Sequence, residues 1–558
     1  MKRAAIVLSV VVVSILISCK HEDMPSGSGG LAAVKPPSVL ERVRAAVRRD
    51  QAKDAAPPPA PAPPPPMSAS SYAYGVAGGV VGGVAGGVVG GVPSAVMVTE
   101  PAPQPSYAKI EEHAFFDTKT AALTTFSIDV DRASYANIRR FLNHNQLPPP
   151  DAVRIEEMVN YFTYALPQPK GDDPFTITTE VSGCPWDSKH RLMRVALQGR
   201  NLDEWKMAPN NLVFLLDVSG SMQPPERLPL IKSAFRLLVN QLRPQDTVAI
   251  VVYAGAAGVV LPPTSGADKA TILQALERLN AGGSTAGAEG IELAYKAAEE
   301  SFQKDGNNRV ILATDGDFNV GISSIEELQK LIEEKRQHNI FLTTIGVGDD
   351  NYRDDMLEML ADKGNGNYAY LDSMKEAEKV FKSELTGTLV TIAKDVKVQI
   401  EFDPALVESY RQIGYENRAL ENKDFEDDTK DAGELGAGHS VTALYEIVPK
   451  SGAKGAIASV RLRYKQPHGD TSRLITASVN DEGASEYAAS GDMKFAAAVA
   501  ELGMLLRNSP HKGTASFADV AALTRSARGA DIDGYRDELL RMVDTSNALK
   551  STKQVASE

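Results

Sequence analysis

The side chains best placed for chemistry follow an apolar run at residues 212–216. The chain continues as Asp217-Val-Ser219-Gly-Ser221, so a carboxylate and two hydroxyls occupy alternate positions. A short, continuously apolar run that ends in a polar turn predicts a strand buried on both faces. Oxygen ligands of these types suit a hard cation such as Mg²⁺. The carboxyl end of a strand in an open parallel sheet is also where such folds place their sites.

Two later segments carry the same kinds of side chain. Gly282-Gly-Ser-Thr285 forms a glycine-rich loop between two stretches with helical spacing. The apolar run 309–314 then ends in Asp315-Gly316, as the first run ends in Asp217. We therefore expect a second buried strand that brings a second carboxylate to the same edge of the sheet.

Together, these three segments closely resemble the metal-ion-dependent adhesion site of the von Willebrand factor type A (VWA) domain. That site is Asp-x-Ser-x-Ser, then Thr, then Asp-Gly. The resemblance implies a Mg²⁺ site (Mn²⁺ or Ca²⁺ could replace it) with one coordination position left open for an Asp or Glu carboxylate of a partner protein. It also implies that the Asp and Thr ligands act partly through water. The implied metal-binding residues are Asp217, Ser219, Ser221, Thr285 and Asp315.

Three functions stay open at this point. The first is a cation-dependent clasp for a protein partner, and the second is a structural or envelope-assembly role in which the metal only stiffens the loops. The third is a metal-dependent hydrolase, which we do not expect because no nearby His, Cys or Lys is placed as base or nucleophile. A hydrogen-bonded turn without metal is a fourth reading. A Rossmann nucleotide site is excluded because Gly-x-Gly-x-x-Gly is absent after the first strand, and the net charge of −13 argues against nucleic acid.

The N-terminus predicts targeting to the cell envelope. Lys2 and Arg3 precede an apolar stretch that is short for a spanning helix. Leu16-Ile-Ser-Cys19 matches the bacterial lipobox and resembles lipoprotein signal peptides. We expect cleavage of residues 1–18 and acylation of Cys19, which would anchor the protein to a membrane with its globular part outside the cytoplasm. The residue after Cys19 is Lys20 and not Asp, which at this position would resemble an inner-membrane retention signal, so the outer membrane is favoured. The alternative to cleavage and acylation is an uncleaved signal anchor.

The rest of the chain divides by composition and periodicity. We expect a Pro/Gly-rich tether, although its Val-Gly-Gly repeats also allow a glycine-zipper helix. Alternating strands and helices predict an α/β fold with a doubly wound, mostly parallel, Rossmann-like sheet in the VWA domain, flanked by a β-rich sandwich and helical segments. The predicted boundaries are 19–105 for the tether, 106–207 for an N-terminal α+β domain, 208–390 for the VWA domain, 391–482 for a β-rich domain and 483–558 for a helical segment.

The flanking segments also resemble a known arrangement. The sequences around 126–156 and 413–447 resemble the segments on either side of the VWA domain in a family of bacterial lipoproteins. We expect the strands at 175–197 and 396–480 to form one sandwich, because pieces this small would otherwise leave exposed edges.

Single residues outside the main site are interpreted as structural. Cys184 is expected to be a buried packing residue, because no second Cys or clustered His accompanies it. Asp129 and Asp131 are expected to cap the helix that follows them. His439 has no ligand partner spaced near it. The acids Asp349, Asp350, Asp354 and Asp355 are expected to favour a helix N-terminus rather than to bind a second cation.

Overall fold

The computed structural model describes residues 105–203, 207–283, 287–316, 325–349, 352–467 and 469–557. These residues lie in one compact unit, Val96–Glu558. The predicted signal peptide, Cys19 and the tether up to residue 104 lie outside the described residues. Within the part of the chain that is described, no helix combines the length and apolarity needed to cross a bilayer.

The VWA region is built on a six-stranded sheet in the order β10-β9-β8-β5-β6-β7. All neighbouring pairs are parallel except β6–β7. The predicted doubly wound, mostly parallel fold is therefore confirmed, with an antiparallel edge strand, β7, that the sequence analysis did not predict. The strands are β5 (Asn210–Asp217), β6 (Thr247–Tyr253), β7 (Ala257–Ser265), β8 (Asn307–Thr314), β9 (Ile340–Gly346) and β10 (Tyr368–Tyr370).

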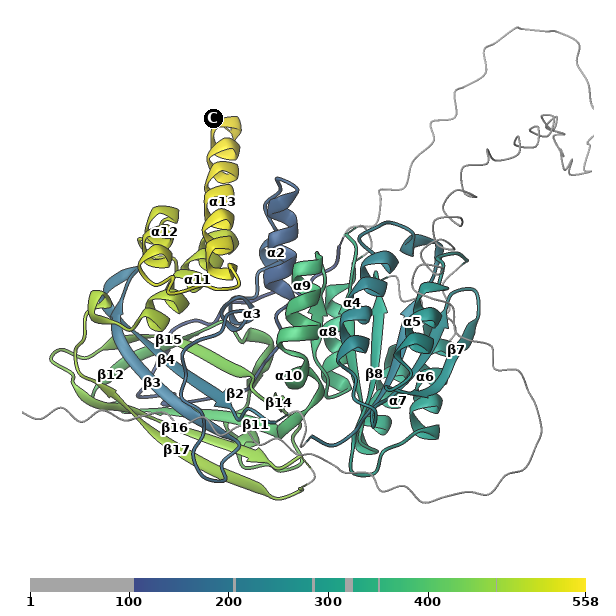
Figure 1. The fold of residues 1–558 in the computed structure, drawn as a ribbon. Coiled ribbons are helices and arrows are strands. Elements are labelled where there is room, and N and C mark those ends of the chain that lie inside the picture. The colour runs from purple at the N-terminus through teal and green to yellow at the C-terminus, as the bar shows by residue number, and fades with distance from the viewer. Residues whose placement is uncertain are drawn as a thin grey trace, which may run out of the picture. The chain divides into compact units, whose positions relative to one another are not determined.

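Helices cover both faces of this sheet (Figure 1). The faces follow from strand geometry, because successive side chains of β5 point to opposite sides. Phe214 packs into the same apolar cluster as α4 (Leu228–Gln241) and α5 (Lys269–Glu277). Leu215 packs with α6 (Gly287–Glu300), α7 (Ile325–Gln337) and α8 (Asp354–Lys363). Burial on both faces explains the uninterrupted apolar run before Asp217.

The last helix of the VWA region is broken. It comprises α9 (Met374–Glu378), a π-helix (Lys379–Ser383) and α10 (Leu385–Leu389). Ser373 caps α9 by accepting a hydrogen bond from the Glu376 backbone N–H at 3.3 Å.

The flanking segments form two more sheets, ordered β1-β12-β15-β4-β3 and β13-β2-β11-β16-β17. Antiparallel pairing of β4 with β15 joins a strand before the VWA region to one after it, which confirms the predicted pairing. Side chains of both sheets, including Val195 and Val398, share one apolar core. The main strands are β2 (Leu123–Ser127), β3 (Phe175–Cys184), β4 (Asp187–Gly199), β11 (Thr391–Phe402), β12 (Val407–Ile413), β15 (Ser440–Pro449), β16 (Gly455–Lys465) and β17 (Ser472–Asp481); the short ones are β1 (Phe116–Asp117), β13 (Ala419–Leu420) and β14 (Leu435–Gly436).

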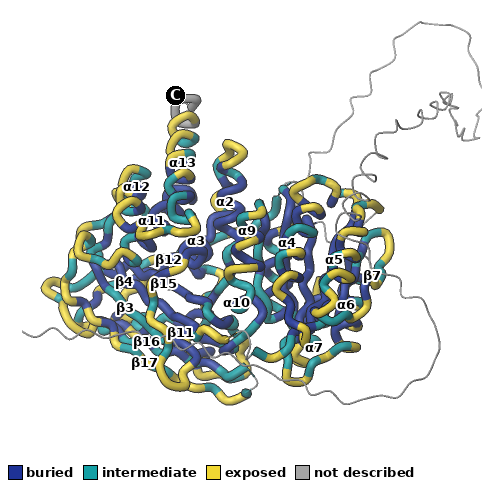
Figure 2. Tube along the Cα trace, viewed as in Figure 1, coloured by how far each residue is buried: buried dark blue, intermediate teal, exposed yellow. Residues whose placement is uncertain are grey.

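Five helices from both ends of the described chain share another core, and most residues of α11 are buried (Figure 2). Within the predicted helical segment 483–558, the helix ends after Ser526 and resumes at Tyr535, and Gly529 and Gly534 in between have φ of +64° and +69°. Glycine adopts that left-handed conformation without steric cost. Cys184 packs in this core as a buried free thiol, as predicted. The helices are α2 (Ala133–Asn143), α3 (Ile155–Asn160), α11 (Gly491–Arg507), α12 (Phe517–Ser526) and α13 (Tyr535–Ser557).

Two arginines join the VWA region to the flanking elements. Arg154, just before α3, binds Asp354 and lies 2.6 Å from Glu358, both on α8. Arg418 lies 3.2 Å from Asp129, 3.4 Å from Asp131 and 2.6 Å from Asp362 of α8. The expectation that Asp129 and Asp131 cap α2 is wrong: the N-cap position shows no side-chain cap, and the two acids compensate a guanidinium that is only 12% exposed.

Candidate metal centre

Asp217 ends β5 with its side chain fully buried. Its Oδ1 accepts a hydrogen bond from the Ser219 backbone N–H at 2.8 Å, and its Oδ2 accepts one from Thr314 Oγ1 at 3.0 Å. Parallel pairing of β5 with β8 sets Leu216 beside Ala313, so the ends of the two strands meet. The carboxylate is therefore oriented by both strands.

The two serine hydroxyls lie side by side. Ser219 is buried and Ser221 half-buried, and their Oγ atoms are 3.0 Å apart. Ser221 lies in a 3₁₀ turn, Gly220–Met222, which turns it back toward Ser219. An octahedral Mg²⁺ with bonds of about 2.1 Å places adjacent ligands about 3 Å apart. The spacing of the two hydroxyls fits adjacent positions around such an ion.

Asp315 follows β8 and is 1% exposed. Arg227, at the N-cap position of α4, donates from Nη1 to Asp315 Oδ2 at 2.8 Å and to the Ser221 carbonyl at 2.9 Å. This arginine therefore connects two of the predicted metal-binding residues. Arg227 could not be predicted as part of the site, because a charged residue in a polar turn before a helix has no sequence feature that distinguishes it from a solvated one.

The glycine-rich loop is joined to the first loop by backbone hydrogen bonds. Gly220 N–H donates to the Gly283 carbonyl at 3.0 Å, and Gly282 N–H donates to the Val218 carbonyl at 2.7 Å. Gly283 has a φ of +95°, a conformation that favours glycine. Thr285, the remaining predicted metal-binding residue, lies outside the described residues.

The electrostatics of the site follow from its burial. Burial raises the pKa of Asp217 to about 6, the hydrogen bonds from Ser219 oppose the rise, and the charge of Asp315 adds to it. A divalent cation between the two carboxylates would stabilise their ionised forms.

The donor set fits a hard cation. The described part of the chain holds no group of three or more His, Cys, Asp or Glu side chains that could bind a metal. The candidate site instead combines two carboxylates with two hydroxyls, which are oxygen donors suited to Mg²⁺, Mn²⁺ or Ca²⁺. Asp217, Ser219, Ser221 and Asp315 are the described residues that would hold the ion.

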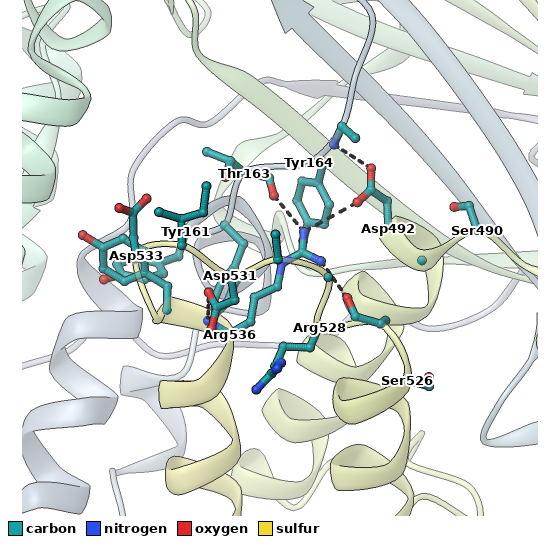
Figure 3. Close-up of a pocket in the computed structure, with 18 of the residues that line it drawn as sticks. Tyr161, Thr163, Tyr164, Ser490, Asp492, Ser526, Arg528, Asp531, Asp533 and Arg536 are labelled. Carbon is teal, nitrogen blue, oxygen red and sulfur yellow. Dashed lines mark hydrogen bonds and ion pairs between the residues drawn. The ribbon is translucent and has the colours of Figure 1, made fainter.

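A cavity of about 930 Å³ lies away from the candidate metal centre, and it is lined by none of the four residues that would hold the ion. Figure 3 shows Arg536 at its centre, where Nη2 donates to the Thr163 carbonyl at 3.0 Å. Asp492 lies 3.5 Å from Arg536 and accepts a hydrogen bond from the Ala165 backbone N–H at 2.7 Å. These polar groups satisfy one another within the protein.

An Asp-x-Ser-x-Ser turn at the end of a central strand in a doubly wound sheet defines a protein with a VWA domain. Family profiles agree: residues 211–383 match the von Willebrand factor type A domain, and residues 102–194 match a profile described as von Willebrand factor. Residues 387–458 and 450–549 match the C-terminal domain of the uncharacterized protein YfbK.

YfbK of Escherichia coli is 42% identical over 475 residues, which cover 80% of this chain and 82% of YfbK. The chain therefore belongs to the YfbK family. An inter-alpha-trypsin inhibitor heavy chain H2 from Mesocricetus auratus is 25% identical over 38% of this chain and 22% of its own length. A von Willebrand factor type A structure from Catenulispora acidiphila is 18% identical with a TM-score of 0.40, covering 66% of this chain and 88% of that one. The VWA domain points to a general role in protein–protein interaction or adhesion.

Proposed function

We propose that this protein captures a protein partner through a divalent cation, Mg²⁺ or in its place Mn²⁺ or Ca²⁺. Asp217, Ser219, Ser221 and Asp315 hold the cation directly or through water, and Thr285 joins them. An Asp or Glu carboxylate of the partner takes the remaining position. The observation that carries the proposal is a pair of hydroxyls 3.0 Å apart next to two buried carboxylates, of which Asp217 is hydrogen-bonded to Ser219 and Asp315 is linked through Arg227 to the Ser221 carbonyl.

The residues around the cation keep the donors in place. The Ser219 backbone N–H and Thr314 Oγ1 fix the carboxylate of Asp217 from two sides. Arg227 fixes Asp315 and the backbone of Ser221. The bound cation supplies a position that attracts an anionic oxygen. Donors that are oriented before binding lose less conformational freedom when the partner arrives. We propose a binding role and no catalytic one.

A purely structural metal is the second candidate. The hydrogen bonds between the 218–220 turn and the 282–283 loop favour it, because a cation there would stiffen loops that are already joined. The two candidates differ in the last coordination position, which a structural site fills from the protein itself.

We further propose that the protein is a lipoprotein of the bacterial cell envelope. Residues 1–18 are removed, Cys19 is acylated, and the anchor lies in the outer membrane rather than the inner one. The Cys19→Ala variant should lose metabolic labelling with palmitate and leave the membrane fraction. Unchanged labelling in that variant would contradict the proposal.

The binding function is tested by crosslinked co-purification from cells, with Mg²⁺ or with EDTA. We expect Asp217→Ala to abolish the captured bands that require Mg²⁺. Asp305→Ala is the matched control, because Asp305 is exposed and lies outside the site. If capture in EDTA, or by Asp217→Ala, equalled capture by the unsubstituted protein in Mg²⁺, cation-dependent binding of a partner would be contradicted.

A further inference from the structure

A groove of about 490 Å³ begins beside the candidate metal centre. At one end it is lined by Met222 and Gln223, which follow Ser221, and by Ala281 of the loop joined to the 218–220 turn. It is also lined by Lys232 of α4 and Glu277 of α5. The groove is therefore adjacent to the position at which a partner's carboxylate would bind.

The helical repeat of α4 arranges one wall of the groove. Leu228, Lys232 and Arg236 are four residues apart, line the groove, and follow one face of the helix. Each step advances about 6 Å along the helix axis. Leu228 and Met222 are 3% and 0% exposed, so they form an apolar floor at the end near the site. The two cations lie progressively farther from the metal centre.

The groove carries two cations and one acid. Lys232 Nζ donates to the backbone carbonyls of Glu277 and Leu279 at 2.9 and 3.2 Å, and lies 3.8 Å from the Glu277 carboxylate. Arg236 contacts the same carboxylate. The side chains of Arg236 and Glu277 are 46% and 52% exposed, and such exposed pairs contribute little to stability. Arg236 can therefore receive a second carboxylate at little cost, and Lys232, whose side chain is 18% exposed, adds its positive charge beside it.

We propose that this groove binds the partner segment that flanks the metal-bound carboxylate. A second acidic residue of that segment, about two to four positions from the first, pairs with Lys232 and Arg236. The spacing follows from the helix repeat, because an extended peptide covers about 3.3 Å per residue. This inference rests on the proposed function. It makes the preferred ligand an extended acidic segment with two carboxylates rather than a single exposed acid.

The net charge of the groove decides between occupants. An excess of one positive charge disfavours a basic segment, and an apolar segment would leave Lys232 and Arg236 without a new partner. An acidic segment is favoured because it already supplies one carboxylate to the adjacent cation. The two carboxylates of the partner thus bind at two neighbouring positive sites, which are the metal ion and the Lys232–Arg236 pair.

The test uses fluorescent peptides and the full-length protein in Mg²⁺, with anisotropy as the readout. One peptide carries Asp and, three residues later, Glu in a glycine background, and its control carries Gln in place of Glu. We expect the Glu peptide to bind about two- to fivefold more tightly at low salt, as for an exposed ion pair, and the advantage to shrink at high salt. Equal affinities would overturn the groove inference.

Charge reversal tests the residues themselves. Arg236→Glu should remove the advantage of the Glu peptide and favour a Lys peptide, with Mg²⁺ affinity by calorimetry unchanged. Lys296→Glu is the matched control, because Lys296 is exposed on α6. A preference for the Glu peptide that survives Arg236→Glu would also overturn the inference. If no peptide binds in a Mg²⁺-dependent manner, the proposed function fails as well, whereas equal Mg²⁺-dependent binding of both peptides overturns the groove alone.

Discussion

Arg227 holds Asp315 in place, with 2.8 Å between Nη1 and Oδ2. The same nitrogen reaches the Ser221 carbonyl at 2.9 Å, and the arginine side chain is only 5% exposed. A single guanidinium thus compensates one buried carboxylate of the candidate metal centre and orients a neighbouring hydroxyl-bearing residue. Without a bound metal ion, Arg227 is the positive charge that the protein itself places beside Asp315.

The first prediction concerns this compensation. Arg227→Gln should lower the free energy of unfolding in EDTA by about 1–3 kcal/mol, because Asp315 keeps its charge but loses its cation. Saturating Mg²⁺ should recover most of that loss, so the rise in Tm caused by Mg²⁺ becomes larger than in the unsubstituted protein. Thermal unfolding with and without Mg²⁺ measures both quantities.

The matched control is Arg278→Gln, an exposed position at the end of α5. Its stability should change little in either condition. A loss in Arg227→Gln that is equal with Mg²⁺ and with EDTA would show that Arg227 acts only as a structural residue.

A second prediction concerns Arg154. Its side chain is 3% exposed and lies among Asp354, Glu358 and Glu157. Arg154→Met should lower the free energy of unfolding by about 3–5 kcal/mol at pH 8, since three buried acids lose their cation. Arg528→Met is the control, because its ion pair with Asp537 is largely exposed.

The loss in Arg154→Met should shrink on acidification. Burial raises the pKa of Asp354 to about 6, and Arg154 opposes that rise. Without Arg154, protonation of the acids in the folded state relieves the repulsion, so stability recovers as the pH falls from 8 to 5. Urea unfolding at both pH values tests this, and a loss of equal size at both would contradict it.

A third prediction concerns Glu501 of α11. Its side chain is 1% exposed, and neither carboxyl oxygen has a hydrogen bond among the described residues. Burial raises its pKa from 4.5 to about 8, with a smaller contribution from Asp519. The unfolded chain loses this proton near pH 4.5 and the folded chain keeps it to about pH 8, so stability falls as the pH rises through that window.

Glu501→Gln should remove this dependence. The variant should match the unsubstituted protein near pH 4.5 and exceed its free energy of unfolding by roughly 4–5 kcal/mol at pH 8.5, because the pKa rises from 4.5 to about 8 and each pKa unit corresponds to about 1.4 kcal/mol. Urea titrations at the two pH values provide the comparison. If Glu501→Gln were no more stable than the unsubstituted protein at pH 8.5, the claim that Glu501 is buried without compensation would be refuted.

The sequence predicted the elements that are buried along their whole length. β5 is buried on both faces, so its apolar run and the terminal Asp217 were legible without a structure. Within the stretch 396–480, where strands are expected, β12 has no clear alternation because Arg411 interrupts its pattern, and only the fold reveals that this arginine is buried against Glu446 at 2.8 Å. β17 has a weak pattern because few of its side chains are buried.

Long-range contacts explain the other differences. The break in the last VWA helix places Lys379 4.7 Å from the ring centroids of both Tyr161 and Tyr535, residues far away in the sequence. Arg227 meets Asp315 across 88 positions. Local periodicity carries no information about such partners, whereas the Asp-x-Ser-x-Ser turn is local and was found.

The central claim is that Asp217, Ser219, Ser221, Thr285 and Asp315 bind a divalent cation that leaves a position for a partner's carboxylate. Calorimetric titration of the full-length protein with Mg²⁺ or Mn²⁺ tests it most directly, with Asp217→Ala as the comparison. We predict saturable binding of about one ion and a rise in Tm, both absent in Asp217→Ala. No heat and no change in Tm with either cation would contradict the account.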